Sequence, residues 1–403
     1  MAVVLALHFA SAQSPTSKWV ATWSPSQQIP EPQNALAPED MRDMTMRQIV
    51  HVSIGGSSLR VHVSNAFGTE PLHFTSMHIA RPISAASSQI DPASDRAVTF
   101  AGAADVTVPA GAEYISDPID YAVKPLSNLA ITLHLDAAPV GETSHPGSRS
   151  TSYYVHGDLV GAADLPNARH ADHWYQLSGI DVRAFAGSAA IVVLGDSITD
   201  GHGTTTNGND RWTDVLAERL QASPATRGLS VINKGIGGNH VLTDGLGPNL
   251  LARFDRDVLA QAGTKYLIVL EGVNDLGGLT RLGDVPATEH ADLVHRIEGA
   301  YEQIVTRAHA AGLAVFGATI TPFVGSEYYH PPATTEADRQ AINNWIRAPG
   351  HFDAVIDFDK ALRDPQQPDH MLPIYDSGDH LHPSIAGYRA MGEAVPLALF
   401  AGD

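Results

Sequence analysis

Polar and apolar residues alternate along the first half of the chain, in short segments separated by Pro, Gly and Ser. The alternating segments include 49–54, 59–64, 97–100, 106–108 and 129–135. Such alternation is typical of half-buried strands, and several short strands in succession predict a β-sandwich or jelly roll. Gly55-Gly56, between the first two segments, predicts the turn of a hairpin. We therefore expect an all-β N-terminal domain over residues 13–187.

From residue 190 onward the pattern changes to continuous apolar runs separated by segments with helical spacing. The apolar runs are 191–194, 229–232, 266–270, 313–316 and 354–356, and they are typical of strands buried on both faces. One helix is expected after the capping candidate Asp210 and another before Gly312, on the periodic residues Trp212, Val215, Leu216, Leu220, Leu293, Ile297, Ile304 and Ala308. This alternation predicts a parallel, doubly wound α/β sheet in a second domain, residues 188–403, which is connected to the first through 177–188.

Composition excludes several classes of protein. The chain has 403 residues, which suits two domains, and its net charge of −19 opposes binding to nucleic acid or to an anionic membrane. It contains no cysteine, so disulfides, thiolate catalysis and cysteine-based zinc sites are excluded. No apolar run is long enough to span a membrane.

The first residues favour an export signal. Residues 2–9 are mostly apolar, and Ala10-Ser11-Ala12 fits the small-x-small pattern of a cleavage site. We predict a signal-peptide remnant over residues 1–12, a mature chain that begins near Gln13, and a secreted or periplasmic location. The positively charged segment that usually precedes the apolar run is missing, and a frayed apolar N-terminus is the alternative.

The segment 190–201, Ala-Ile-Val-Val-Leu-Gly-Asp-Ser-Ile-Thr-Asp-Gly, carries the most chemical information. It places Ser197 directly after a buried strand, at the edge where open α/β sheets bind their ligands. A serine there is a candidate nucleophile, which needs a base, a residue that orients the base, and donors for an oxyanion. Asp379 precedes His382 by three residues, so the carboxylate can reach one imidazole nitrogen while the other faces Ser197.

Two further polar segments follow predicted strands and are expected at the same edge of the sheet. Gly238 ends Asn-Lys-Gly-Ile-Gly-Gly and offers an unobstructed backbone N–H, and Asn274 in Gly-Val-Asn-Asp offers a side-chain amide. Together with the N–H of Ser197, these groups form a candidate oxyanion hole with three donors.

At this point the chain resembles the SGNH hydrolases, also called GDSL esterases. The resemblance covers the second domain and rests on four blocks in order: Gly-Asp-Ser197, Asn-x-Gly-Ile-x-Gly238, Gly-x-Asn274-Asp and Asp379-x-x-His382. It implies a flavodoxin-like three-layer fold and ester hydrolysis with neither metal nor cofactor. It also implies a triad of Ser197, Asp379 and His382, and an oxyanion hole of Ser197, Gly238 and Asn274. Ile198 replaces the leucine of the family's nickname, a change that conserves volume.

Each block also has a purely structural interpretation. Ser197 could cap a helix, Gly238 could serve only a positive φ, and Asn274 could belong to a plain turn. His380 competes with His382 as the base, and we favour His382 for its spacing to Asp379. The group His330, His370, His380 and His382 matches no known metal-ligand spacing, so we predict no metal site. A nucleophile elbow of the Gly-x-Ser-x-Gly type is excluded by Thr199.

Two loops are expected near the candidate nucleophile, at 239–249 and 322–335. We name Asn239, Tyr328 and Tyr329 as candidate substrate-binding residues, with plain surface loops as the alternative. A β-rich domain joined to an SGNH module resembles secreted bacterial esterases that deacetylate plant polysaccharides, so an acetylated carbohydrate is the predicted substrate. A broad arylesterase or short-chain lipase is one alternative, and a carbohydrate-binding protein with an inactive hydrolase half is another.

Overall fold

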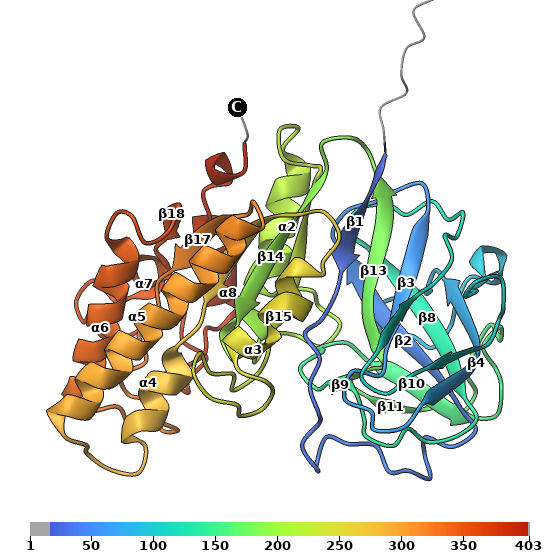
Figure 1. Cartoon of the computed structure of the whole chain (residues 1–403), viewed down its shortest axis with the longest axis horizontal. Coiled ribbons are helices and arrows are strands. Elements are labelled where there is room, and N and C mark those ends of the chain that lie inside the picture. The colour runs from blue at the N-terminus through green and yellow to red at the C-terminus, as the bar shows by residue number, and fades with distance from the viewer. Residues whose placement is uncertain (1–16, 402–403) are drawn as a thin grey trace, which may run out of the picture.

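The computed structural model describes residues 17–401 and shows two adjoining lobes (Figure 1). The N-terminal lobe (17–184) consists of β-sheets, and the C-terminal lobe (189–401) is a sheet covered by helices. The predicted signal-peptide residues 1–12 lie outside the described residues. Across 17–401, no helix combines the length and the apolar character needed to span a bilayer.

The N-terminal lobe is built from antiparallel strands, as predicted. One sheet has the order β1-β13-β3-β7, a larger one has the order β11-β10-β2-β8-β4-β5 with β6 beside β4, and β12 pairs with β9. The strands are β1 Lys18–Trp23, β2 Met44–Val52, β3 Leu59–Ser64, β4 Leu72–Ala80, β5 Arg96–Ala97, β6 Val106–Val108, β7 Glu113–Ile115, β8 Ser127–Leu135, β9 Ser144–His145, β10 Ser152–His156, β11 Arg169–Ala171, β12 Trp174–Tyr175 and β13 Leu177–Ala184. A short 3₁₀ helix, η1 Pro92–Ser94, lies between β4 and β5.

The predicted hairpin at Gly55-Gly56 is wrong, because β2 and β3 belong to different sheets. Strand β2 pairs with β8 and β10, whereas β3 pairs with β13 and β7. The glycines allow close approach as the chain crosses between sheets. A Cβ on Gly55 would lie 2.3 Å from the Val123 carbonyl oxygen. Alternation reveals which faces of a strand are buried, but it does not reveal which strand lies beside it.

The C-terminal lobe contains the predicted parallel sheet. Its five strands have the order β15-β14-β16-β17-β18, which is the flavodoxin-like order 2-1-3-4-5, and the family resemblance implied this fold. The strands are β14 Ala189–Gly195, β15 Leu229–Gly235, β16 Thr264–Leu270, β17 Ala314–Ala318 and β18 Ala354–Ile356. The helices are α1 Ser197–Asp200, α2 Trp212–Ala222, α3 Leu250–Phe254, the π-helical turn η2 Asp255–Leu259, α4 Val273–Thr280, α5 Ala287–Ala310, α6 Ala333–Arg347, α7 Phe358–Leu362, α8 Ile385–Ala394 and the 3₁₀ helix η3 Leu397–Leu399.

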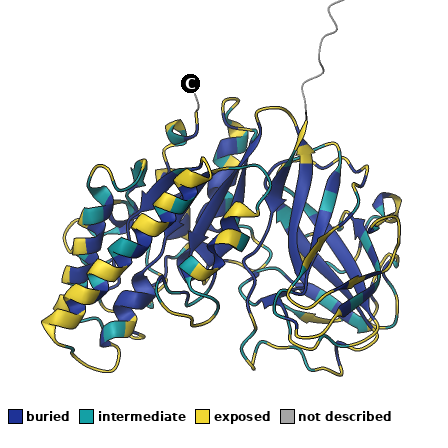
Figure 2. Ribbon diagram, in the orientation of Figure 1, coloured by how far each residue is buried: buried dark blue, intermediate teal, exposed yellow. Residues whose placement is uncertain are grey.

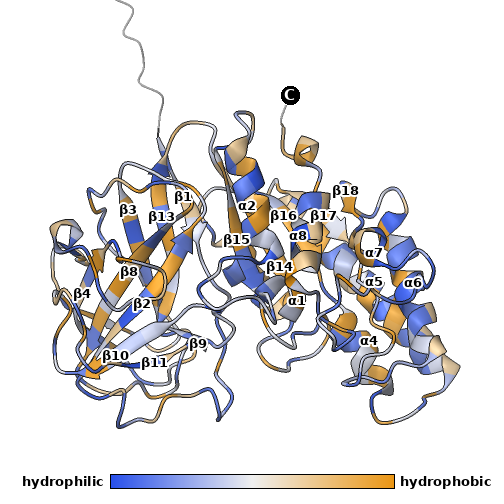
Figure 3. Cartoon of the chain, turned by 180° about the vertical axis from the view of Figure 1, so that it is seen from behind, coloured by the Kyte–Doolittle hydropathy of each residue, from blue (hydrophilic) through white to orange (hydrophobic). Residues whose placement is uncertain are grey.

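Burial follows the predicted pattern in this lobe. Every residue of β14 is buried, whereas α5 has one buried face and one exposed face (Figure 2). The sheet strands consist mostly of hydrophobic residues, whereas the outer helices mix hydrophobic and hydrophilic residues (Figure 3). The carboxyl ends of β14, β15 and β16 meet at one edge of the sheet, so the segments that follow these strands lie next to one another.

Two local predictions need correction. Asp210 does not cap α2, because Arg211 occupies the N-cap position and the Asp210 carboxylate instead accepts a hydrogen bond from the Thr205 N–H. Most of the predicted connection 177–188 is strand β13, so only residues 185–188 link the two lobes. The apolar residues of β13 pair with β1 and β3, which gives this segment a structural role of its own.

Candidate active site

Ser197 lies at a sharp strand-to-helix junction. It is the first residue of α1, directly after β14, and the Asp196 carboxylate caps this helix by accepting from the Ile198 N–H at 2.8 Å. A Cβ on Gly195 would lie 2.2 Å from the Thr199 hydroxyl, so the strand can bend into the helix only with glycine there. The Ser197 side chain is therefore held at the carboxyl edge of the sheet.

A hydrogen-bonded chain joins Ser197 to the C-terminal histidine and aspartate. The Ser197 Oγ lies 2.8 Å from His382 Nε2, and His382 Nδ1 lies 2.6 Å from Asp379 Oδ2. The rival His380 points elsewhere, with its Nδ1 bonded to Asp376 at 2.6 Å. The structure thus brings the three predicted triad residues together and separates His380 from them.

The Asp379 carboxylate is organised to remain ionised. Although partial burial opposes its charge, hydrogen bonds from the His382 ring and from the backbone N–H groups of Leu381 and His382 lower the pKa of Asp379 well below its usual range. Its Oδ1 also accepts from the Ser377 hydroxyl at 2.9 Å. A charged Asp379 fixes the His382 tautomer so that Nε2 faces the serine unprotonated.

Donors surround the space beside the serine hydroxyl. The backbone N–H groups of Ser197 and Gly238 make no hydrogen bond to any residue within 17–401. Gly238 has a φ of +67°, which favours glycine, and a Cβ there would lie 2.8 Å from Leu246 Cδ1, so the leucine side chain would have to move. Asn274, near the start of α4, lines the same cavity. The three residues predicted to supply oxyanion donors therefore line one cavity.

Asn274 is held by Asn239 and Tyr329, two residues that the sequence analysis named as candidates for substrate binding. Its Nδ2 donates to the Asn239 carbonyl at 2.7 Å, and its Oδ1 accepts from the Tyr329 hydroxyl at 2.6 Å. The Asn239 side chain is fully buried and bonds to Arg253 and to the Pro248 carbonyl, so it does not line the cavity. The prediction of Asn239 as a substrate-binding side chain is corrected to a structural one.

His202 lies next to the triad, although the sequence analysis did not single it out. Its ring packs on that of His382, with centroids 4.0 Å apart and planes tilted by 31°. Loss of solvent around the ring and the nearby His382 lower the pKa of His202 to about 4, so it stays neutral near pH 7. Its position five residues after Ser197 is the only sequence feature that could have pointed to it.

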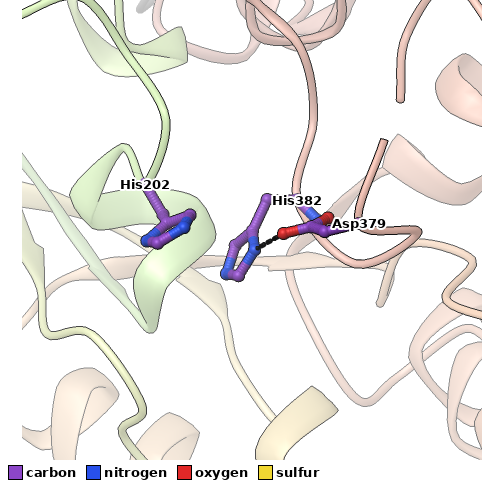
Figure 4. A group of neighbouring side chains, drawn as sticks. All are labelled: His202, Asp379 and His382. Atoms are coloured by element: carbon purple, nitrogen blue, oxygen red, sulfur yellow. Dashed lines mark hydrogen bonds and ion pairs between the residues drawn. The ribbon is translucent and has the colours of Figure 1, made fainter. Parts of the chain in front are cut away.

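His202, Asp379 and His382 also form a group with the donor types of a metal site (Figure 4). Imidazole nitrogens bind metals in the plane of the ring, and these two rings lie one over the other. Both nitrogens of His382 are already engaged, one by Ser197 and one by Asp379. The donor set therefore fits a proton relay and does not fit a chelate.

A cavity of about 800 Å³ opens above the triad. Both predicted loops contribute to its wall, through Leu246 from one and Tyr328 and Tyr329 from the other. Tyr328 is half-exposed and carries the Arg281 guanidinium over its ring at 4.0 Å, whereas Tyr329 is buried. Sequence reasoning missed Arg281, which lies just after α4.

Comparison with protein families identifies this part of the chain. Residues 193–390 match the model of the GDSL-like lipase/acylhydrolase family. The C-terminal lobe belongs to that family. The match spans all four sequence blocks that surround the cavity, so the predicted resemblance is confirmed. Comparison with curated protein sequences gives no match.

Several solved structures resemble the GDSL lobe. A putative lipolytic protein of the G-D-S-L family from Desulfitobacterium hafniense has 24% identity and a TM-score of 0.39, with 51% of this chain and 97% of that chain covered. An acetylxylan esterase from Geobacillus stearothermophilus has 22% identity and a TM-score of 0.40, with 54% and 96% covered. A hydrolase from the metagenome of Lake Arreo, Spain, has 24% identity and a TM-score of 0.38, with 53% and 95% covered.

Three buried carboxylates lie close to the candidate site in the C-terminal lobe. Burial raises the pKa of Asp196 to about 7, and burial together with the charge of Asp196 raises the pKa of Glu271 well above 4.5. Among residues 17–401, neither Glu271 carboxylate oxygen has a hydrogen-bond partner, and Arg253 Nη2 lies 3.6 Å from Oε2. Asp275 is better satisfied, since it accepts from the N–H groups of Val241 and Leu242 and so anchors the loop that follows Gly238.

These raised pKa values predict that alkaline pH weakens the fold. Folded Asp196 and Glu271 hold protons that the unfolded chain releases above about pH 4, so the free energy of unfolding falls as the pH rises through about 7. Glu271→Gln removes one of the charges that form, and we expect it to raise Tm at pH 8 and to change it little at pH 5. Thermal unfolding at both pH values tests this, with the exposed Glu302→Gln as control. An equal shift in Tm at the two pH values would contradict it.

Proposed function

We propose that this protein is a serine hydrolase of carboxylic esters, with Ser197 as nucleophile, His382 as general base and Asp379 as the residue that orients it. The observation that carries the proposal is the hydrogen-bonded chain from Ser197 Oγ through His382 to Asp379, at the base of an open cavity. Membership of the GDSL-like lipase/acylhydrolase family supports the same class of reaction.

The geometry gives each residue one task in the acylation step. Ser197 Oγ attacks the ester carbonyl carbon while its proton moves to His382 Nε2, and Asp379 stabilises the imidazolium that forms. The carbonyl oxygen becomes an oxyanion, which accepts from the N–H groups of Ser197 and Gly238 and from the Asn274 amide. As the C–O bond to the alcohol breaks, His382 returns the proton to the departing alkoxide. The products of this half-reaction are a free alcohol and an acyl-serine.

Deacylation repeats these steps with water as the nucleophile. His382 takes a proton from the water molecule that attacks the acyl carbon, and the same three donors hold the second oxyanion. When this intermediate collapses, His382 protonates Ser197 Oγ and the carboxylic acid leaves. One set of residues therefore serves both half-reactions.

For the substrate, we propose short acyl groups, acetyl above all, carried by sugars or plant polysaccharides. The cavity is far larger than an acetyl group, so most of its space is available to the alcohol part of the ester. Arg281, Glu327 and the Tyr328 hydroxyl lie on its wall and can hydrogen-bond to hydroxyl groups. The broad arylesterase or short-chain lipase is the second candidate, favoured by the apolar surfaces of Leu246 and Tyr328 in the same wall.

A panel of acyl chains separates the two candidates. For an acetylesterase, we expect kcat/KM on p-nitrophenyl acetate to exceed that on p-nitrophenyl octanoate by about tenfold or more, because a short-acyl site gains little from added methylenes. Acetate release from acetylated xylan should then occur with the purified enzyme. Faster turnover of octanoate, with no acetate released from xylan, would favour the lipase.

The alternative of a carbohydrate-binding protein with an inactive hydrolase half finds less support. None of the five tryptophans is exposed: Trp23 and Trp174 pack against each other in the N-terminal lobe, and Trp19 lies between Arg60 and Arg183. Flat sugar-binding platforms need exposed aromatic faces, which these residues do not offer.

Export to the periplasm or the medium remains a proposal that rests on residues 1–12, and N-terminal sequencing of the mature protein tests it.

A further inference from the structure

The helix that carries Ser197 is a single turn, and it needs support from its surroundings. Helix α1 contains four residues, too few to be stable without tertiary contacts. On one side it packs directly on β15, where a Cβ on Gly235 would lie 2.2 Å from the Asp200 backbone nitrogen. Further contacts come from residues 143–151 of the N-terminal lobe, which comprise strand β9 and the loop after it and which the site prediction did not include.

His145 makes the central contact of this loop. Its Nε2 lies 2.9 Å from the Asp200 carboxylate at the end of α1, and its Nδ1 lies 2.7 Å from the Ser26 carbonyl. The ring stacks on Trp174 at 5.6 Å, and both His145 and Asp200 are almost completely buried. Because each ring nitrogen has a partner and one face is covered, the position of Asp200 is coupled to the N-terminal lobe.

The residues that follow His145 reinforce the same contact. A Cβ on Gly147 would lie 1.8 Å from the Asp200 carboxylate, so only glycine lets the loop pass this close. Arg149 Nε donates to the Gly201 carbonyl at 3.2 Å, and Arg211 donates both to the Ser148 carbonyl and to the Asp200 carbonyl. The loop thus holds the backbone of the turn that ends α1.

This turn joins the nucleophile to His202. The backbone N–H groups of Gly201 and His202 both donate to the Ser197 carbonyl at 2.9 Å, and the His202 ring then packs on His382. A shift of Asp200 would therefore move Ser197 and the ring that supports its base together. A displacement of about 1 Å at a reacting group can reduce turnover by about 10²-fold.

We propose that the N-terminal lobe holds the catalytic serine in place, and that His145 and Arg149 are positioning residues for Ser197. The inference rests on the proposed esterase function. It assigns to the β lobe a role in turnover, in contrast to a separate sugar-binding module or a passive cover.

The test uses the full chain with His145→Ala and, as a milder second variant, Arg149→Ala. Two rates are measured well below Tm: kcat and KM on p-nitrophenyl acetate, and the rate at which diethyl p-nitrophenyl phosphate inactivates the enzyme. We expect kcat and the inactivation rate of His145→Ala to fall by about tenfold or more, with KM nearly unchanged, because binding groups are untouched. His145→Gln, which keeps a donor for Asp200, should recover part of the loss.

His134→Ala is the matched control. His134 is also a buried histidine of the N-terminal lobe with both ring nitrogens bonded, to Thr75 and Asp43, but no residue of the C-terminal lobe is among these partners. It should lower Tm without lowering kcat. Full kcat in folded His145→Ala and Arg149→Ala would overturn the inference, as would an equal loss in His134→Ala. If His145→Ala does not fold, Arg149→Ala decides alone. Absence of any esterase activity in the unmodified chain would instead refute the proposed function.

Discussion

Replacing Ser197 by alanine should reduce hydrolysis of p-nitrophenyl acetate by about 10⁴-fold or more, because no other group can form the acyl intermediate. Within residues 17–401, the Ser197 hydroxyl forms a side-chain hydrogen bond only to His382, so Tm and the circular dichroism spectrum should change little. Initial rates over a wide range of enzyme concentration measure the residual activity, and thermal unfolding measures Tm. Activity within a factor of ten of the original enzyme would show that Ser197 is not the nucleophile.

The two neighbouring histidines supply a matched pair for this first prediction. His382 and His380 are close in the sequence, and each bonds to an aspartate through Nδ1, but only His382 reaches Ser197. His382→Ala should lose as much activity as Ser197→Ala, since triad residues act as a unit. His380→Ala should keep most of the activity. A reversal of these two results would assign the base to His380.

The second large effect is expected at Asn274. Asn274→Ala removes one oxyanion donor and should reduce kcat by about 10² to 10³-fold. KM should change little, because the donor is matched to charge that develops only in the transition state. Steady-state kinetics on p-nitrophenyl acetate separate the two parameters. An effect confined to KM would place Asn274 in substrate binding and not in the oxyanion hole.

Tyr329→Phe offers a graded version of the same test. The Tyr329 hydroxyl is a hydrogen-bond partner of Asn274 Oδ1, so its loss leaves the amide in place but less firmly oriented. We expect a decrease in kcat smaller than that of Asn274→Ala, and the double variant should be no worse than Asn274→Ala alone. Additive losses in the double variant would show that Tyr329 acts independently, for example by contacting the substrate.

The sequence was sufficient to predict the sheet of the C-terminal lobe and the convergence of four blocks. Strands buried on both faces leave continuous apolar runs, and parallel strands deliver the segments that follow them to one edge. Ser197, Gly238 and Asn274 each follow such a run, which is why their proximity could be inferred without coordinates. His382 could be chosen over His380 only through its spacing to Asp379, because both histidines have an aspartate nearby.

Other features were beyond reach of the pattern because they depend on contacts between distant segments. Strands β2 and β3 alternate like a hairpin and yet enter different sheets. Asn239 follows the oxyanion glycine, but its side chain is buried against Arg253, a residue that the pattern does not distinguish from an exposed arginine. The contact of His145 with Asp200 joins the two lobes across 55 residues, and no local pattern in either segment predicts it.

Covalent labelling tests the central claim most directly. Diethyl p-nitrophenyl phosphate should react once with the native protein, release p-nitrophenolate and leave a diethylphosphoryl group on Ser197, found by peptide mapping. Loss of esterase activity should follow the extent of labelling in equal proportion, and the label should fail to appear in Ser197→Ala and His382→Ala. A fully active enzyme that carries its label on another residue, or that resists labelling while it hydrolyses esters, would contradict the assignment of Ser197 as the nucleophile.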